Sequence, residues 1–341
     1  MSVATTQPRV DELARAAEVC VRTALQLQAG ERLVLVHDRV AADAARALVH
    51  CARALGAEVR AVDLAKLGRR PLPALPDWVA GALENAHASV FIASALPGEL
   101  GLRQQVLHRV RQLGLRHAHM PGISTLAFCR GQRIDYDRVA QCGERVLAKL
   151  RGARQLEVHS PSGTALHVEL AESCRWFAQL GRLAPGRWGN LPAGALYASP
   201  ARVDGVFAVD ASLGEYFGAR EGQLGDRPVQ LRIESSRVVA VHAPGAAALE
   251  REIGAMLHFA ENSDRVGLVA LGVNYGIEQA TGEALVDQNL PGLHLAVGDP
   301  AARVTGATWS ARTSFAACGA HATVLVDGVP VTVRGKLLAT N

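Results

Sequence analysis

The chain has 341 residues, more than a single hydrophobic core usually holds, so its length favours two domains. Hydrophobic residues make up 49% and charged residues 20% of the sequence, a balance that excludes a disordered chain. The net charge of +4 is small and the basic residues are scattered among acidic ones, which argues against a nucleic-acid-binding protein.

Cysteine spacing and the N-terminus indicate the compartment. Six cysteines occur without a CxxC pair, so neither a zinc ribbon nor a disulfide framework is indicated, and reduced thiols are expected. The first residues lack the basic start and unbroken apolar run of a secretion signal. Because no apolar stretch reaches the roughly 18 residues that a membrane span needs, we expect a soluble, cytoplasmic protein without a membrane partner.

The first half of the chain alternates helical and strand patterns. A helix is expected over 9–29, followed by the strand RLVLVHD at 32–38, a helix over 41–55 and the strand EVRAVDL at 58–64. Further helices are predicted at 76–86, 101–114 and 135–150, and further strands at 88–95 and 116–120. This alternation predicts a Rossmann-like α/β domain with a mostly parallel sheet over 1–152, with a link at 151–154.

From residue 155 onward the patterns are mainly those of strands. The segments 155–160 and 165–171, joined by the turn PSGT, predict a hairpin. More strands are expected at 203–211, 229–243, 266–274, 293–299 and 322–333, with one helix at 245–261. The second domain, 153–341, is therefore predicted to be β-rich and α+β in class.

Common cofactor and nucleophile motifs are missing from the sequence. It contains neither GxxxxGK[ST] nor GxGxxG after a strand, and the first strand-to-helix turn, HDRVAAD, lacks the glycines that let a backbone approach a pyrophosphate. No GxSxG elbow is present either. We therefore expect no dinucleotide or other cofactor and no serine hydrolase.

Two histidines two positions apart, His117 and His119, face the same side of a predicted strand. Such a pair can bind a metal, or it can form local hydrogen bonds at the strand end. Local bonding is favoured, because no third ligand lies nearby in the sequence.

The most informative motifs begin at Asn190. The string NLPAGALYASP at 190–200 resembles the NLPAGE-x-[YF]-x-[AS]-P motif of the thermophilic metallo-aminopeptidases, the aminopeptidase T group. LGVN at 271–274 resembles that family's E-x-G-[IL]-G-x-N segment, and HLAVG at 294–298 resembles its G-x-x-H-I-A-x-G segment. Weaker similarity extends over nearly the whole chain. The same fold group includes the iron-dependent 2,5-dihydroxypyridine dioxygenase, so the resemblance leaves the reaction type open.

The resemblance implies two divalent metals held by glutamates, histidines and an aspartate. At the matching positions this sequence has Ala195 and, close to the second glutamate, Leu268. The family's H-x-D pair falls in the window 312–318, which contains neither histidine nor aspartate. Only His294 remains, and one imidazole cannot hold a divalent ion that needs three protein donors. The sequence therefore predicts a degenerate, metal-free member of the family without catalytic residues.

The first functional hypothesis is a non-catalytic protein that binds a peptide in the crevice between its domains, or by strand addition to a sheet edge. Degenerate members of this fold resemble the peptide-binding partners of pathways that modify ribosomally made peptides, such as crocagin biosynthesis, so a precursor peptide is the expected partner. By analogy with the family we expect a homodimer. The predicted ligand-binding residues are Arg187, Asn190, Tyr197, Arg220, Asn274 and His294.

Two alternatives remain open. One is a metal-dependent aminopeptidase or non-haem iron dioxygenase whose ligand set has moved to His294, His321 and Asp287, with Glu278 nearby in sequence. The other is a structural subunit that pairs with an active homologue. Metal analysis separates the first alternative from the peptide-binding hypothesis, and co-purification would reveal the second.

Overall fold

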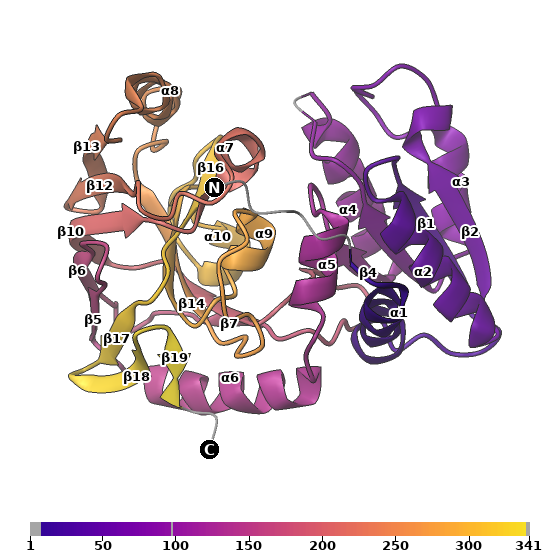
Figure 1. Ribbon diagram of the computed structural model, residues 1–341, viewed down its shortest axis with the longest axis horizontal. Coiled ribbons are helices and arrows are strands. Elements are labelled where there is room, and N and C mark those ends of the chain that lie inside the picture. The colour runs from indigo at the N-terminus through magenta and orange to yellow at the C-terminus, as the bar shows by residue number, and fades with distance from the viewer. Residues whose placement is uncertain (1–7, 97, 339–341) are drawn as a thin grey trace. The chain divides into compact units, whose positions relative to one another are not determined.

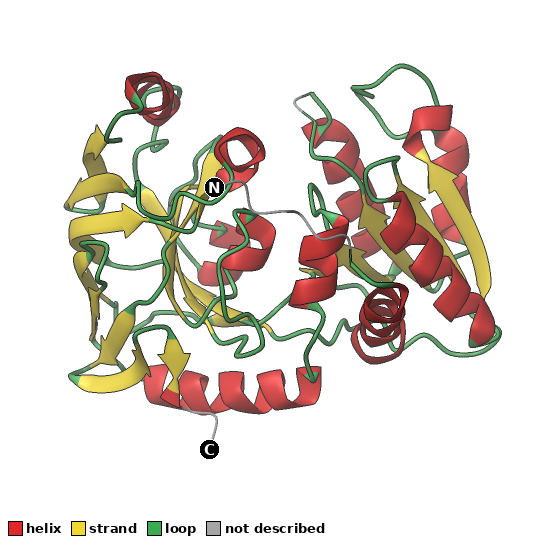
Figure 2. Ribbon diagram, in the orientation of Figure 1, coloured by secondary structure: helices red, strands yellow, loops and turns green. Residues whose placement is uncertain are grey.

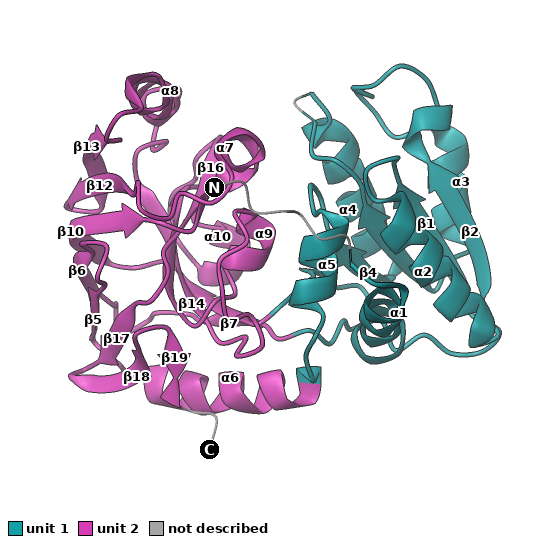
Figure 3. Ribbon diagram, in the orientation of Figure 1, with its two compact units in different colours: residues 1–136, 181–193 teal, residues 137–180, 194–341 magenta. Residues whose placement is uncertain are grey.

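The computed structural model describes residues 8–96 and 98–338, and the chain divides into two compact units (Figure 3). Unit 1 holds residues 1–136 and 181–193, and unit 2 holds residues 137–180 and 194–341. This division differs from the expected boundary between 152 and 153. Helix α6 (Tyr136–Leu150) lies almost entirely in unit 2, and a later segment returns to unit 1 and adds the short strand β8 (Trp188–Asn190) to its sheet.

Unit 1 is built on a five-stranded parallel sheet in the order β2, β1, β3, β4, β8 (Figures 1 and 2). Besides β8, its elements are α1 (Val10–Glu18), η1 (Val19–Ala24), β1 (Arg32–His37), α2 (Ala42–Ala54), β2 (Glu58–Asp63), η2 (Leu64–Lys66), α3 (Asp77–Glu84), β3 (Ala88–Ile92), α4 (Leu100–Leu113), β4 (Arg116–His119) and α5 (Thr125–Gly131).

Apolar side chains fix the helices on this sheet. Every residue of β3 is buried, as expected for a central strand covered on both faces. Helices α3 and α4 pack on the face that carries Val34, Val36 and Phe91, and α4 contributes Val106 and Val110 at helical spacing. Helix α2 contacts β1, β2 and α1. The predicted α/β class is confirmed.

Two local features of unit 1 escaped the sequence patterns. The expected helix over 9–29 is α-helical only to Glu18 and continues as the π-helix η1, in which the amide of Leu25 donates to the carbonyl of Cys20 at 2.9 Å. Helix α5 was not predicted. Ser124 caps it by accepting a hydrogen bond from the amide of Ala127 at 3.1 Å.

Unit 2 contains two antiparallel-paired sheets with short helices between their strands (Figures 1 and 2). Its elements after α6 are β5 (Gln155–His159), β6 (Ala165–Glu169), β7 (Phe177–Gln179), β9 (Ala195–Ala198), β10 (Arg202–Val209), β11 (Ser212–Leu213), α7 (Gly214–Glu221), β12 (Val229–Glu234), β13 (Arg237–His242), α8 (Ala247–Leu257), β14 (Val266–Gly272), α9 (Ala284–Asp287), β15 (Gly292–Gly298), α10 (Ala302–Thr305), β16 (Ser314–Cys318), β17 (Thr323–Val326), β18 (Val329–Val333) and β19 (Lys336–Leu337).

The larger sheet has the order β13, β12, β10, β6, β5, β17, β18, β19, and the smaller has the order β11, β16, β15, β14, β9, β7. The predicted hairpin is confirmed, because β5 and β6 pair antiparallel around the turn at 161–164. Strand β10 pairs with β6, and the two backbones are so close at Gly205 that a Cβ there would lie 2.2 Å from the carbonyl oxygen of Ala165. The β-rich second part of the chain agrees with the predicted class.

All six cysteines are free thiols, as expected from their spacing. Within residues 8–96 and 98–338, no helix combines the length and apolar character that crossing a membrane requires.

Candidate functional site

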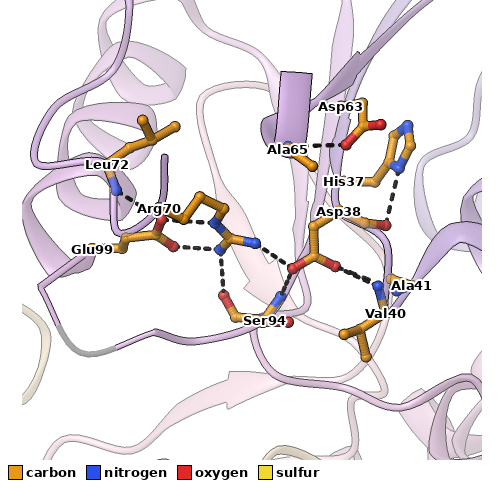
Figure 4. A network of polar contacts seen from close by, with 10 residues as sticks. All are labelled: His37, Asp38, Val40, Ala41, Asp63, Ala65, Arg70, Leu72, Ser94 and Glu99. Atoms are coloured by element: carbon orange, nitrogen blue, oxygen red, sulfur yellow. Dashed lines mark hydrogen bonds and ion pairs between the residues drawn. The ribbon is translucent and has the colours of Figure 1, made fainter. Parts of the chain in front are cut away.

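The carboxyl edge of the parallel sheet in unit 1 is closed by a buried ion-pair network (Figure 4). Asp38 follows β1 and Ser94 follows β3, the two strands that flank the point where the strand order reverses. Doubly wound folds bind ligands at this point. Here the Arg70 side chain occupies it. Its guanidinium donates to the Glu99 carboxylate, with one distance of 2.8 Å, to the carbonyl of Ser94 at 3.1 Å and to Asp38.

The network also uses the amides that a phosphate would need. The carboxylate of Asp38 accepts hydrogen bonds from Val40 at 3.1 Å, from Ala41 at 3.4 Å and from the amide of Ser94 at 2.8 Å. Burial alone would raise the pKa of Asp38, but hydrogen bonds from Ser94 and Arg70 outweigh burial and lower it. The charged side chains at this edge of the sheet therefore bond one another, and the three backbone amides near Asp38 are already used.

The predicted histidine pair lies in unit 1 and is bonded locally. His117 Nδ1 lies 2.8 Å from Ser89 Oγ, and His117 Nε2 lies 3.2 Å from His119 Nδ1. The His119 ring stacks on Phe91 with centroids 5.4 Å apart. Burial lowers the pKa of His117 to about 3 and that of His119 well below its usual value, so both rings are neutral. Local bonding, the favoured interpretation, is confirmed.

In unit 2 the family motifs meet on one face of the six-stranded sheet. Directly opposed residues of antiparallel strands project from the same face, and the pairing of Leu295 with Ala317 puts His294 beside Cys318. One row of side chains thus crosses all six strands. From β7 to β11 this row consists of Phe177, Tyr197, Ala270, His294, Cys318 and Ser212.

Two positions at which the family resemblance implies glutamates, 195 and 268, hold apolar residues next to this row. Ala195 forms a buried cluster with Tyr197 and Ala270, and Phe177 and Leu268 pack against it. The rings of Phe177 and Tyr197 stack with centroids 5.0 Å apart and an interplanar angle of 15°. An aromatic and aliphatic surface of this kind penalises a hydrated dication, because nothing replaces the water that the ion loses. We call these five residues the apolar cluster.

His294 lies in this row without the other metal-binding side chains that the family resemblance implies. Its ring is 1% exposed, and Nε2 donates to the carbonyl of Leu290 at 2.9 Å, which leaves Nδ1 as the acceptor. Across the residues that the structure describes, Nδ1 has no hydrogen-bond partner. Burial lowers the pKa of His294 to about 4, so the ring is neutral. The carbonyl of Leu290 approaches closely because residue 272 is glycine, where a Cβ would lie 1.8 Å from that oxygen.

The alternative ligands do not assemble around His294. The carboxylate of Asp287 accepts three hydrogen bonds, from the amide and hydroxyl of Thr281 at 2.7 and 2.8 Å and from the amide of Gly282 at 3.0 Å. His321 is exposed at a turn with φ of 54°, and Glu278 is exposed. Within the described ranges no three histidine, cysteine, aspartate or glutamate side chains form a group able to hold a metal ion. The residues present therefore do not fit the family's dinuclear centre.

The six predicted ligand-binding residues are divided between the units. Arg187 is exposed at the start of β8, and Asn190 ends that strand, both in unit 1. In unit 2, Tyr197 and His294 share the row described above. Asn274 is fully buried and its Oδ1 accepts from the amide of Gly276 at 3.2 Å.

Arg220 stands apart from that row. It lies on α7, and its guanidinium is already bonded to Glu221 and Glu252 at 2.6 and 2.9 Å. The sequence interpretation also missed Phe177 and Cys318, because only the pairing of distant strands places them beside Tyr197 and His294.

The chain combines a parallel α/β unit with a β-rich unit that carries most of the motifs resembling those of the metallo-aminopeptidases. A family model for the thermophilic metalloproteases (M29) matches residues 135–327. Because this match covers more than half of the chain, the protein belongs to the thermophilic metalloprotease (M29) family.

Two solved structures are similar over nearly their full length. One is 2,5-dihydroxypyridine dioxygenase from Pseudomonas putida KT2440, with 17% identity, a TM-score of 0.68, and coverage of 97% of this chain and 99% of that chain. The other is wild-type AmpT from Thermus thermophilus, with 21% identity, a TM-score of 0.65, and coverage of 96% and 99%. The TM-scores and coverages show that this chain shares its fold with both structures. A comparison with curated protein sequences finds no match.

Proposed function

We propose that this protein is a non-catalytic peptide-binding member of the metalloprotease family. The observation that carries the proposal is the apolar cluster, where Ala195 and Leu268 replace the carboxylates that the family resemblance places there. Without carboxylate donors the scaffold has no means of holding a dication that would activate water. The partly exposed ring of Phe177, which stacks on the buried Tyr197, instead offers a contact for apolar ligand groups.

An extended peptide is the ligand that this sheet suits. Among the described strands, β7 lies at one edge of the six-stranded sheet. It carries Phe177 next to the exposed Ala178. A peptide added to this edge would bond through its backbone, while alternate side chains would face the apolar cluster. A precursor peptide of a ribosomal natural-product pathway, as in crocagin biosynthesis, is the ligand class that we propose.

Metal analysis and calorimetry test this function together. Purified protein, dialysed against zinc, manganese or iron(II), is expected to retain less than one metal ion per chain and to leave an aminoacyl reporter unhydrolysed. Isothermal titration with short precursor peptides encoded beside the gene is expected to give saturable binding. Stoichiometric metal with reporter hydrolysis would refute the proposal, as would the failure of every peptide to bind.

A matched variant connects the binding to the apolar cluster. Tyr197→Ala removes the ring that stacks on Phe177 and is expected to weaken peptide binding by about tenfold or more, the usual range for an aromatic anchor. Tyr216→Ala, at an exposed aromatic residue on α7, serves as the control and is expected to bind like the wild type. Equal affinities for the wild type and Tyr197→Ala would place the peptide elsewhere.

A further inference from the structure

A charged groove runs along the N-terminal helix of unit 1, far in sequence from the residues of the apolar cluster. Its volume is about 800 Å³, within the range of ligand-binding clefts. Four guanidinium groups and two carboxylates line it, which gives a net charge of +2. The lining residues are Arg9, Glu12, Arg15, Glu18, Val19, Arg22, Thr23 and Arg133.

The ion pairs already present in this groove are weak. Arg133 bonds Glu12, whose side chain is 20% exposed, whereas Arg9 bonds Asp11 at 3.0 Å and Arg22 bonds Glu18 at 3.1 Å between side chains that are 47–74% exposed. Exposed pairs of this kind contribute about 0–1 kcal/mol each. The guanidinium of Arg15 forms no hydrogen bond or ion pair with any other described residue. Carboxylates of a ligand can therefore pair with Arg15 directly and replace the internal partners of Arg9 and Arg22 at small cost.

The π-helix η1 shapes this groove. Its hydrogen bond from Leu25 to Cys20 spans five residues instead of the four of an α-helix, which widens the turn. Val19, Arg22 and Thr23 line the groove from this wide turn. Turns of this type are rare and frequently occur at functional sites. The backbone irregularity and the excess of positive charge thus coincide.

We propose that this groove binds an acidic, extended peptide segment of a partner. From Arg9 to Arg22 the helix extends about 20 Å at about 1.5 Å per residue, which matches about six residues of an extended strand. Residues 1–7 contain neither aspartate nor glutamate, so the chain's own N-terminal segment does not supply the carboxylates. This inference rests on the proposed function, because it takes the ligand to be a peptide. It adds that the peptide is acidic and that residues of unit 1 contact it.

Fluorescence anisotropy tests the inference directly. The probe is a fluorescein-labelled, glutamate-rich peptide of about six residues, and a lysine-rich peptide of the same length is the control. The wild type is expected to bind only the acidic probe, and more weakly as the salt rises from about 50 to about 200 mM. Arg15→Glu combined with Arg22→Glu is expected to weaken binding by about a hundredfold, and Arg15→Gln by about tenfold.

Matched controls keep this test decisive. Arg251→Glu, at an exposed position on α8, changes the charge of one residue outside the groove and is expected to bind like the wild type. Circular dichroism verifies that each variant is folded. The inference is overturned if the wild type fails to bind the acidic probe at low salt, or if the folded double variant binds it equally well. The assay contains no metal, so stoichiometric metal with reporter hydrolysis, found separately, would refute the proposed function and leave this inference standing.

Discussion

Replacing Arg70 by methionine gives the sharpest test of the buried network in unit 1. The change keeps most of the side-chain stem but removes the guanidinium, and it leaves two carboxylates, Asp38 and Glu99, whose side chains are 4% and 1% exposed. Breaking a buried ion pair by removing one partner typically costs about 3–5 kcal/mol. We therefore expect Arg70→Met to lower the free energy of unfolding of unit 1 by about that amount. This corresponds to a decrease of about 10 °C in the midpoint of thermal unfolding.

The pH dependence of this loss follows from the two carboxylates. In the wild type the pKa values of Asp38 and Glu99 are lowered, because hydrogen bonds to Arg70 and backbone amides outweigh burial. Their contribution is complete above the unfolded pKa of about 4 and is lost as the pH falls through the lower folded pKa. Without Arg70, burial raises both pKa values, and the carboxyls protonate in the folded state. The difference between variant and wild type should therefore narrow below about pH 5.

Urea denaturation followed by circular dichroism measures the loss, and hydrogen exchange of the β1 and β3 peptides assigns it to unit 1. Arg46→Met is the matched control, because the Arg46–Asp43 pair is 73% and 55% exposed and should change stability by less than about 1 kcal/mol. Adding Asp38→Asn and Glu99→Gln to Arg70→Met is expected to restore much of the loss, since no buried charge then remains unpaired. An Arg70→Met protein as stable as the Arg46→Met control would refute the reasoning.

Four further substitutions test packing and hydrogen bonding within the two units. Gly272→Ala should lower the free energy of unfolding by about 2 kcal/mol or more, because its Cβ would lie 1.8 Å from the Leu290 carbonyl oxygen. Gly254→Ala on α8, with open space around its Cβ, should instead raise the free energy of unfolding by about 0.5–1 kcal/mol. Burial lowers the pKa of His117 to about 3, so the unfolded chain binds this proton first, and the free energy of unfolding should fall as the pH drops from about 6.5 to about 5. His117→Asn should reduce that slope in urea titrations and leave the contributions of the buried His119 and His294, and an unchanged slope would contradict the assignment. Tyr136→Phe should cost about 1–2 kcal/mol in the same titrations, since it removes the buried hydroxyl that accepts from the amide of Ala193 at 3.2 Å and donates to Gln132 Oε1 at 2.8 Å.

Local patterns were sufficient for most of the elements. The continuous apolar run of β3 and the spacing of Val106 and Val110 on α4 depend on residues close in sequence, so they predict a covered parallel sheet without further information. The hairpin of β5 and β6 was predicted for the same reason, because a short polar turn separates two alternating strands. By contrast, β8 was missed, because three residues carry no period and pair only with a strand far earlier in the chain.

The absence of carboxylates at positions 195 and 268 could be read from the sequence, since Ala195 and Leu268 have no metal-binding side-chain atoms in any conformation. What those residues form instead was decided by strand order. Sheet pairing brings Phe177 against Tyr197 and places Cys318 beside His294, although these residues come from segments far apart in the chain.

The sequence by itself therefore determined the two-part α/β and β-rich architecture, the family and the missing carboxylates, because each depends on residue types or on neighbours along the chain. Only the tertiary structure decided that Arg70 bonds Asp38 at the carboxyl edge of the sheet in unit 1. It also decided that Arg133 shares a groove with the arginines of the N-terminal helix. Both arrangements depend on side chains that meet through folding, and no periodicity along the chain encodes such a meeting.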